Sequence, residues 1–291
     1  MRRSAGRVST RLARAASLVL LAALGTITLM RFAPGYFTDV REVDGKYGNG
    51  ARAALNIQQE EQGSAITLTT HLLGNWLHGD LGRSRQYDIP VTELIGSRAK
   101  VTVRLLLSGM AFGWLLALAL ALALSARKTA AGEAMIAGPS AILLAIPIAA
   151  MATTCLLLNV GGPVLVLTTL IGIRDFKSIY RLLRHTWKSP YLLYARSQGI
   201  RSSRITFIYL LPALTAELRA LAVTSFVIAL SAIVPVEVIF DLPGLGQLAW
   251  SAAMNRDLPV LLAVTLLMAA CIGLAGMVST SARTIEVTPC A

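Results

Sequence analysis

Six apolar segments alternate with polar and basic stretches along the chain. A helix needs about 20 apolar residues to cross the roughly 30 Å hydrocarbon layer of a membrane, and about 17 suffice where flanking side chains reach the lipid surface. Each segment reaches or approaches this length, so the pattern predicts an all-α integral membrane protein with about six transmembrane helices. The predicted spans are Ala15–Met30 within a transmembrane segment 15–32, Leu105–Leu124, about Ala134–Leu158, about Pro163–Ile173, about Ala213–Val234 and Leu258–Val278.

Two of these spans are short. Ala15–Met30 is bracketed by Arg14 and Arg31, whose aliphatic stems can extend it to the lipid surface. A cleaved signal peptide is the alternative, but the segment lacks a clean small-x-small cleavage site and is long for the apolar part of such a peptide. The span that starts at Pro163 has to extend through the basic residues that follow it, toward Tyr180, to cross a membrane.

The third span contains two prolines, Pro139 and Pro147. A proline removes one helical hydrogen bond and clashes with the preceding turn. Neighbouring helices in a membrane can satisfy the freed backbone groups. We therefore expect a continuous third span that is bent, if at all, at these prolines.

A polar stretch, residues 33–100, connects the first two spans. Its acidic and basic residues nearly balance, so we expect an extramembrane loop or small subdomain. The chain then divides into an N-terminal tail, a first helix, this subdomain, a transmembrane domain that contains a basic loop, and a C-terminal tail. The expected ranges are 1–14, 15–32, 33–100, 101–281 with the basic loop 174–210, and 282–291.

Lysine and arginine are unevenly distributed between the loops. Five lie in the N-terminal tail, two in 125–133 and eight in 174–210, whereas 159–162 has none and 235–257 has one, Arg256. Cytoplasmic loops carry an excess of these residues, while long translocated loops are largely insensitive to charge. Both termini are therefore predicted to face the cytoplasm, and the subdomain 33–100 is predicted to be periplasmic.

The composition agrees with a membrane protein and disfavours other classes. Hydrophobic residues make up 55% of the 291 residues and the mean hydropathy is +0.64, more than a soluble domain of this size can bury. The net charge of +12 does not indicate nucleic-acid binding, because the basic residues fall between apolar segments rather than on one soluble face. Cys155, Cys271 and Cys290 form neither a disulfide framework nor a metal-ligand spacing.

Residues for catalysis or ion coupling are not expected in the cores of the spans. Their absence there disfavours an ion-coupled carrier, and histidines that all lie outside the spans disfavour a membrane protease. No glycine-rich loop precedes a Lys-Ser or Lys-Thr pair, so no ATPase site, catalytic residue or metal site is predicted within the chain. The ionisable residues nearest the spans are expected at their edges: Arg104, Glu133, Glu217, Arg219, Glu237 and Asp257.

The basic loop contains a short sequence that predicts a capped helix. Ser189 can accept a backbone N–H at the helix start, Pro190 suits the first turn, and Gly199 can adopt the left-handed conformation that ends a helix. Ala195 and Gly199 are small and four residues apart, so we expect a face that another protein can approach closely. An amphipathic connector on the lipid surface is the alternative.

This segment resembles the cytoplasmic signature of ABC importer permeases. In that signature an alanine is followed four residues later by a glycine, and Leu-Pro ends thirteen residues beyond the glycine, as at Ala195, Gly199 and Leu211-Pro212. The acidic residue of the signature would fall at Leu193, so its ionic contact is not implied here. The resemblance implies a helix that couples to an ATPase subunit through Tyr191, Ala195, Arg196, Gly199, Ile200 and Pro212.

A second resemblance lies in the loop before the last span. Residues 237–246 and 255–260, together with Gly79-Asp80-Leu81-Gly82, are similar to sequences of permeases for dipeptides, oligopeptides and nickel. By themselves the prolines and glycines here predict a tight turn without a ligand role. The acidic residues are expected to hold the loop or to dock a binding protein, and solvated charges of little effect are the alternative. The resemblance implies a periplasmic loop or gate formed by Glu237, Asp241, Pro243, Gly244, Gly246, Asn255 and Asp257.

Both resemblances imply a divergent permease subunit of an ABC transporter, with a type I fold, in the bacterial inner membrane. It would form half of a substrate pathway, with peptides as the expected substrate and a nickel chelate as the alternative. The implied partners are a second homologous permease, two ATP-binding-cassette ATPases and a periplasmic or lipid-anchored substrate-binding protein, surrounded by membrane lipid. ATP and Mg²⁺ would be used by the ATPases, and no cofactor would bind the chain directly.

A non-transporting membrane scaffold or sensor with the same fold is the alternative function. Residues 279–285 replace the acidic, aromatic and Asp-Pro-Arg residues that are usual at the C-terminus of such permeases. This difference marks the chain as divergent and keeps the alternative open.

The distribution of basic residues generates a topology prediction. In a cysteine-free background, a thiol introduced at Gln62 should react with a membrane-impermeant reagent added outside the cell, and one at Ser202 should react only after the membrane is opened. Labelling in the opposite pattern would mean that the chain is inserted the other way round.

Overall fold

The computed structural model describes residues 81–125, 142–255 and 257–283, with Ala13, Ser17, Gly74 and residues 19–22 and 24–26. Within this part of the chain all regular structure is helical, apart from one isolated bridge between Arg83 and Pro90. The chain divides into unit 1, Met1–Val101 with Pro243–Gly273, and unit 2, Thr102–Leu242 with Leu274–Ala291. Most of the predicted tail 1–14, first span and subdomain 33–100, and the tail beyond residue 283, lie outside the described residues.

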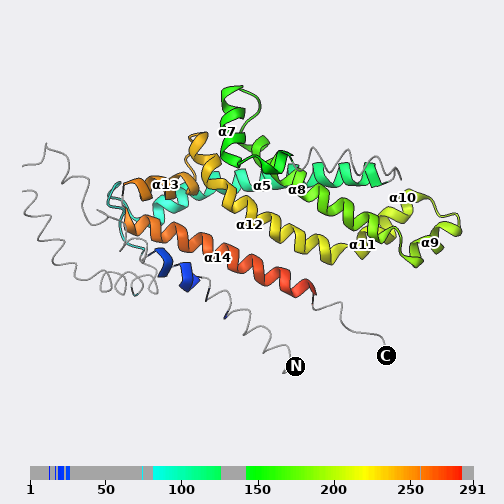
Figure 1. The fold of residues 1–291 in the computed structure, drawn as a ribbon. Coiled ribbons are helices and arrows are strands. Elements are labelled where there is room, and N and C mark those ends of the chain that lie inside the picture. Colours follow the sequence, from blue (N-terminus) through cyan, green and yellow to red (C-terminus); the bar gives the residue numbers. More distant parts are fainter. Residues whose placement is uncertain are drawn as a thin grey trace, which may run out of the picture. The chain divides into compact units, whose positions relative to one another are not determined.

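The helices follow the apolar pattern of the sequence (Figure 1). Their bounds are α5 Val91–Ser125, α7 Ile148–Leu157, α8 Pro163–Thr186, α9 Pro190–Ser197, α10 Ser202–Arg204, the π-helix η1 Ile205–Leu210, α11 Leu211–Ala213, α12 Thr215–Ile239, α13 Leu245–Met254 and α14 Leu258–Arg283.

Three of the described helices are long and apolar enough to cross a membrane: Val91–Ser125, Thr215–Ile239 and Leu258–Met277. They contain the predicted second, fifth and sixth spans, although the fifth begins two residues later than expected. All three exceed their predicted spans, because the polar turns at their ends continue the same helices. The all-helical membrane architecture predicted from the sequence is therefore confirmed.

The third and fourth predicted spans differ from expectation in opposite ways. The third is not continuous: residues 142–145 are helical, the helix breaks at Ile146-Pro147, and α7 then covers only 10 residues. Pro147 lacks the N–H that would continue the helix, which explains the break. The fourth lies in α8, which runs unbroken for 24 residues and continues past Tyr180. It is not among the three described helices that are long and apolar enough to cross a membrane.

Small residues let α5 and α8 pack closely within unit 2. Gly109, Gly113, Ala117 and Ala121 recur every fourth residue and form one buried face of α5. A Cβ at Gly109 would lie 2.6 Å from Cβ of Leu167 on α8, closer than two carbons can approach. Small residues at this spacing bring helices together in membranes, where packing rather than water exclusion holds them.

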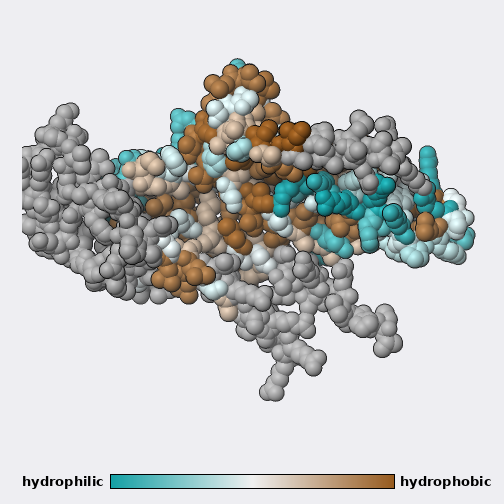
Figure 2. Space-filling view, in the orientation of Figure 1, coloured by the Kyte–Doolittle hydropathy of each residue, from teal (hydrophilic) through white to brown (hydrophobic). Residues whose placement is uncertain are grey.

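The other face of α5 is apolar and exposed. Leu107, Phe112 and Leu115 are 62%, 58% and 64% exposed in the chain. Figure 2 shows similar apolar side chains over α7 and hydrophilic ones over the part of unit 2 that carries α9. Exposed leucine and phenylalanine on a helix of this length fit contact with lipid.

Within unit 2, α12 packs against both α7 and α8 (Figure 1). One core of this unit joins α5 and the second half of α8 to α9 and η1. Its fully buried large side chains are Ile179 and Leu183 of α8, Leu192 of α9, and Ile205 and Leu210 of η1. The short elements α9 and η1 therefore share a core with a long helix.

Unit 1 has its own core. Val91 and Leu94 at the start of α5 pack with residues of α13 and α14, such as Leu248 and Val264. The loop before α5 folds back on itself, since the N–H of Val91 donates to the carbonyl of Gly82, which has φ +78°. Glycine suits this turn because other residues adopt positive φ at a cost.

The contact between α5 and α8 generates a stability prediction. Gly109→Ala should lower the melting temperature of the purified protein by several degrees, because overpacking of a tight core costs about 1–3 kcal/mol. Gly96→Ala in the same helix is the matched control, since a Cβ there meets nothing within 4 Å. Thermal unfolding in detergent, followed by tryptophan fluorescence, makes the comparison. Equal melting of the two variants would contradict the close packing.

Candidate functional site

The predicted short helix in the basic loop is present as α9. Pro190 occupies its first turn, after Ser189 in an extended conformation, and Gly199 follows it with φ +73°. These are the start and stop signals that the sequence predicted. One detail was wrong: the hydroxyl of Ser189 caps no N–H of α9 and instead donates to the carbonyl of Thr186 at 2.6 Å. The serine therefore ties the start of α9 to the end of α8.

One face of α9 is buried inside the chain. Leu192 is fully buried and Ala195 is 7% exposed, both in the core shared with α8 and η1. The expectation that Ala195 and Gly199 form one outward face is therefore wrong for Ala195. Its small side chain permits close packing within the chain, and Ile200 packs partly buried against the same core.

The opposite face of α9 is exposed and rich in aromatic and aliphatic groups. Tyr191 is 48%, Leu193 51% and Tyr194 66% exposed, and the neighbouring π-helix adds Phe207 and Ile208 at 65% and 53%. We call these five residues the aromatic face. Of these five residues, the sequence predicted only Tyr191 as a coupling residue. No sequence motif indicated that residues 205–210 form a π-helix with exposed side chains next to α9.

The remaining predicted coupling residues are Arg196 within α9, and Gly199 and Pro212 after it. The guanidinium carbon of Arg196 lies 5.7 Å from the ring centroid of Trp187, a cation–π contact between α9 and the end of α8. A Cβ at Gly199 would meet nothing within 4 Å, so glycine is required there by its φ and not by neighbours in the chain. Pro212 is exposed within α11.

The acidic residues of the last loop differ in their surroundings. Glu237, in the last turn of α12, is fully buried and its Oε1 accepts a hydrogen bond from Thr102 Oγ1 at 2.7 Å. Asp241 is exposed and has φ +50°. The alternative of solvated charges is therefore wrong for Glu237, whereas Asp241 lies at the surface.

Asp257 is also buried, and it joins two sequence motifs within unit 1. Its Oδ2 accepts hydrogen bonds from Ser84 Oγ at 2.5 Å and from the backbone N–H of Gln86 at 3.2 Å. Ser84 in turn accepts the N–H of Tyr87 at 3.0 Å. This carboxylate therefore joins two segments that are far apart in the sequence. One is 255–260, and the other is the loop that follows Gly79-Asp80-Leu81-Gly82.

The glycines of the last loop begin a helix that the sequence did not predict. Gly244 is the buried N-cap residue of α13 and Gly246 is buried in its first turn, while Pro243 before them is exposed. Asn255 ends α13 and its side-chain amide donates to the carbonyl of Ser251 at 2.8 Å. The expected turn is therefore the start of a 10-residue helix.

Asp175 is a buried carboxyl that sequence reasoning missed. It is fully buried on α8 and lies 2.5 Å from Ser225 Oγ on α12. The expectation that ionisable residues lie only at the edges of the spans is therefore wrong for this predicted span. Its position between Arg174 and Phe176, within a stretch needed to complete the span, was the available signal.

The chain is similar to known permease proteins of import systems. No protein-family model matches the chain. The chain is 31% identical over 107 residues to the metal-staphylopine import system permease protein CntB of Staphylococcus aureus, a match that covers 37% of the chain and only 34% of that relative. It is 23% identical over 279 aligned positions to the nickel import system permease protein NikB of the same species, covering 84% of the chain and 80% of NikB.

The described helices and the similarity to these permeases support an all-helical membrane fold of the ABC importer type I class. The chain is similar, at low identity, to permeases of nickel and metal-staphylopine import systems, in agreement with the resemblance noted in the sequence.

The Asp257 contacts generate a prediction about the loop 82–90. Asp257→Ala should raise the rate of tryptic cleavage after Arg83 and Arg85 about tenfold, because Ser84 and Gln86 lose the acceptor that holds the loop. Mass spectrometry of fragments from detergent-solubilised protein measures the rate. Asp241→Asn, an exposed site where asparagine tolerates the positive φ, should leave cleavage unchanged. Equal rates in both variants would show that Asp257 does not hold the loop.

Proposed function

We propose that the chain is one permease subunit of an ATP-driven importer. In this proposal it forms half of the substrate pathway, beside a second homologous permease, above two ATPase subunits and below a substrate-binding protein. Three long apolar helices and the similarity to import permeases support it. ATP and Mg²⁺ are assigned to the ATPase partners.

The aromatic face of α9 and η1 is the observation that carries this proposal. Large aromatic and aliphatic side chains exposed together, beside the basic residues Arg196, Arg201 and Arg204, are typical of a protein-docking surface. On the opposite face of α9, Leu192 and Ala195 pack into the core shared with α8 and η1. We assign this surface to an ATPase subunit, in agreement with the signature spacing.

The buried side of α9 supports a mechanism. Close-packed cores transmit displacement because their side chains have no room to move independently. A movement of a docked ATPase would therefore carry α9, η1 and the second half of α8 together. Such rigid-body motion, biased by the ATPases, would alternate access to the pathway from the two sides of the membrane.

The proposed substrate includes metal complexes as well as peptides. The names of the two similar permeases refer to nickel and to metal-staphylopine, whereas peptides were predicted from the sequence resemblance alone. We therefore propose nickel or a metal–chelator complex as the first substrate to test, with dipeptides as the second. We also propose the inner membrane as the location, with both termini in the cytoplasm.

The proposed coupling is tested at Gly199 and Tyr194. Gly199→Val should reduce co-purification of the ATPase subunits several-fold, because a β-branched residue at φ +73° is strained by about 1–3 kcal/mol. Tyr194→Asp should do the same by placing a charge in the aromatic face. ATP hydrolysis by the reconstituted complex, with its binding protein and either nickel chelate or dipeptide, should fall in parallel.

Gly199→Asn is the matched control, because asparagine tolerates positive φ and a side chain there meets nothing within the chain. It should retain most of the association. If Gly199→Val and Tyr194→Asp both bind the ATPases as the wild type does, α9 is only a connector on the lipid surface. If the wild-type complex assembles but never hydrolyses ATP, the scaffold alternative is favoured.

A further inference from the structure

Asp175 and Ser225 form a buried polar pair between α8 and α12 in unit 2. Asp175 is fully buried and Ser225 is 1% exposed. Ser225 Oγ lies 2.5 Å from Asp175 Oδ2 and also 2.9 Å from the carbonyl oxygen of Leu221, one turn back on α12. The second carboxyl oxygen, Oδ1 of Asp175, is buried without a hydrogen-bond partner.

The number of hydrogens in this arrangement indicates the protonation state of Asp175. A serine hydroxyl has one hydrogen, so Ser225 can make one full donation, either to Asp175 or to Leu221. If Asp175 were ionised, it would have this one shared donor and a bare, buried Oδ1. If Asp175 carries a proton on Oδ2, it donates to Ser225 Oγ, and Ser225 donates to Leu221 O. Both short contacts are then hydrogen bonds.

Asp257 in unit 1 shows the contrasting arrangement. Two donors, Ser84 Oγ and the N–H of Gln86, converge on one oxygen of that carboxylate. Ser84 accepts the N–H of Tyr87, so its hydrogen is directed at Asp257. Oδ1 of Asp257 is buried without a hydrogen-bond partner, as Oδ1 of Asp175 is, so the two sites differ in their Oδ2 atoms. Two donors meet at Oδ2 of Asp257, whereas Oδ2 of Asp175 has the shared hydroxyl of Ser225.

We propose that Asp175 is held in its neutral, protonated form and acts as a positioning residue that ties α8 to α12. This inference rests on the proposed function, because it gives the route by which movement of α9 reaches α12. A charged carboxyl buried between two helices is unfavourable, whereas a neutral one that donates a hydrogen bond joins the helices.

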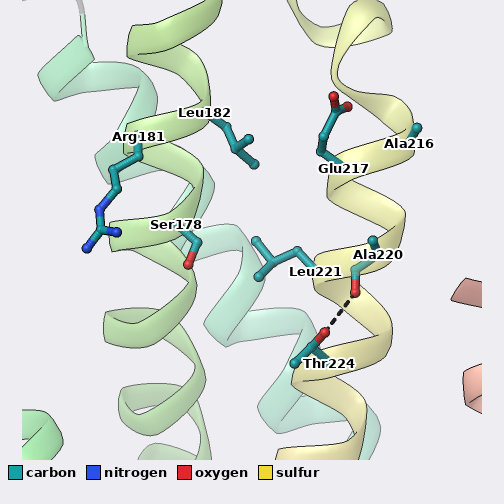
Figure 3. A pocket seen from close by; sticks show the side chains of 8 residues that line it. All are labelled: Ser178, Arg181, Leu182, Ala216, Glu217, Ala220, Leu221 and Thr224. Atoms are coloured by element: carbon teal, nitrogen blue, oxygen red, sulfur yellow. Dashed lines mark hydrogen bonds between the residues drawn. The ribbon is translucent and has the colours of Figure 1, made fainter. Parts of the chain in front are cut away.

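The Asp175–Ser225 contact lies next to a pocket between α8 and α12. A pocket of about 540 Å³ opens between α8 and α12 on the side of Ser178 and Leu182 of α8 and Glu217 and Leu221 of α12 (Figure 3). Ser178 is three residues beyond Asp175, and Thr224 next to Ser225 also lines the pocket. Apolar packing between the helices is interrupted here, so the Asp175–Ser225 hydrogen bond holds the pair at the edge of the gap.

Both ends of this connection are built into other elements. Phe176 and Ile179, close to Asp175 on α8, belong to the core that holds Leu192 of α9. On α12, the same helix that carries Ser225 ends at buried Glu237 and its hydrogen bond to Thr102. A displacement of α9 therefore passes through α8 and Asp175 to α12.

Asp175→Asn and Asp175→Leu test the tie together. Asparagine keeps a neutral donor for Ser225, so its complex should hydrolyse ATP within about twofold of the wild type, with the binding protein and nickel chelate or dipeptide present. Leucine has a similar size but no donor, so hydrolysis should fall roughly tenfold, the effect of losing one buried hydrogen bond. ATPase co-purification should stay normal in both variants. Equal loss in both, or in neither, would overturn the proposal.

Infrared spectroscopy tests the proton without depending on transport. The purified wild-type permease at neutral pH should show a protonated-carboxyl C=O band that Asp175→Asn lacks and that the control Asp88→Asn, at an exposed aspartate, retains. An unchanged band in Asp175→Asn would show that Asp175 is ionised and would overturn the inference. If the wild-type complex hydrolyses no ATP, the proposed function fails. Two measurements still test the Asp175–Ser225 hydrogen bond in that case. They are the infrared band and the melting temperature, which we expect to fall for Asp175→Leu and not for Asp175→Asn.

Discussion

In the described part of the chain, each buried acidic side chain is held by a hydrogen bond with another segment of the chain, and this constraint accounts for much of the packing. The backbone meets a similar constraint by folding the described residues into helices. The buried acidic side chains satisfy it by pairing with hydroxyl groups: Asp175 with Ser225, Glu237 with Thr102, and Asp257 with Ser84. Each pair joins segments that are far apart in the sequence. The polar groups that are most costly to bury therefore also hold distant segments together.

Helix α9 illustrates how one short element can serve two surfaces. Its buried face, Leu192 and Ala195, fastens it to α8 and η1, and its aromatic face remains exposed. The docking role proposed for α9 needs both properties, because a loosely attached helix would move without transmitting force. Small residues have a related effect in α5, where Gly109 and Gly113 allow α8 to approach closely.

The similarity to nickel and metal-staphylopine import permeases agrees with this architecture while the level of identity remains low. The segments around α9 and the last loop contain residues with a backbone role, namely Gly199 with its positive φ, Gly244 at a helix start and Pro190 in a first turn. Such residues are hard to replace because the constraint is on the main chain. Side chains on exposed faces have no such restriction, which is consistent with divergence elsewhere.

The sequence by itself determined the helical membrane class, the positions of three long spans, and where α9 begins and ends. Hydrophobic length, proline and glycine act locally, so their consequences can be derived from neighbouring residues alone. The tertiary structure decided which side of α9 is buried, that the loop after Gly244 becomes a helix, and which acidic residues are enclosed. Asp241 and Asp257 look alike in the sequence, yet one is exposed and the other buried, because burial depends on contacts with distant residues such as Ser84 that no local pattern encodes.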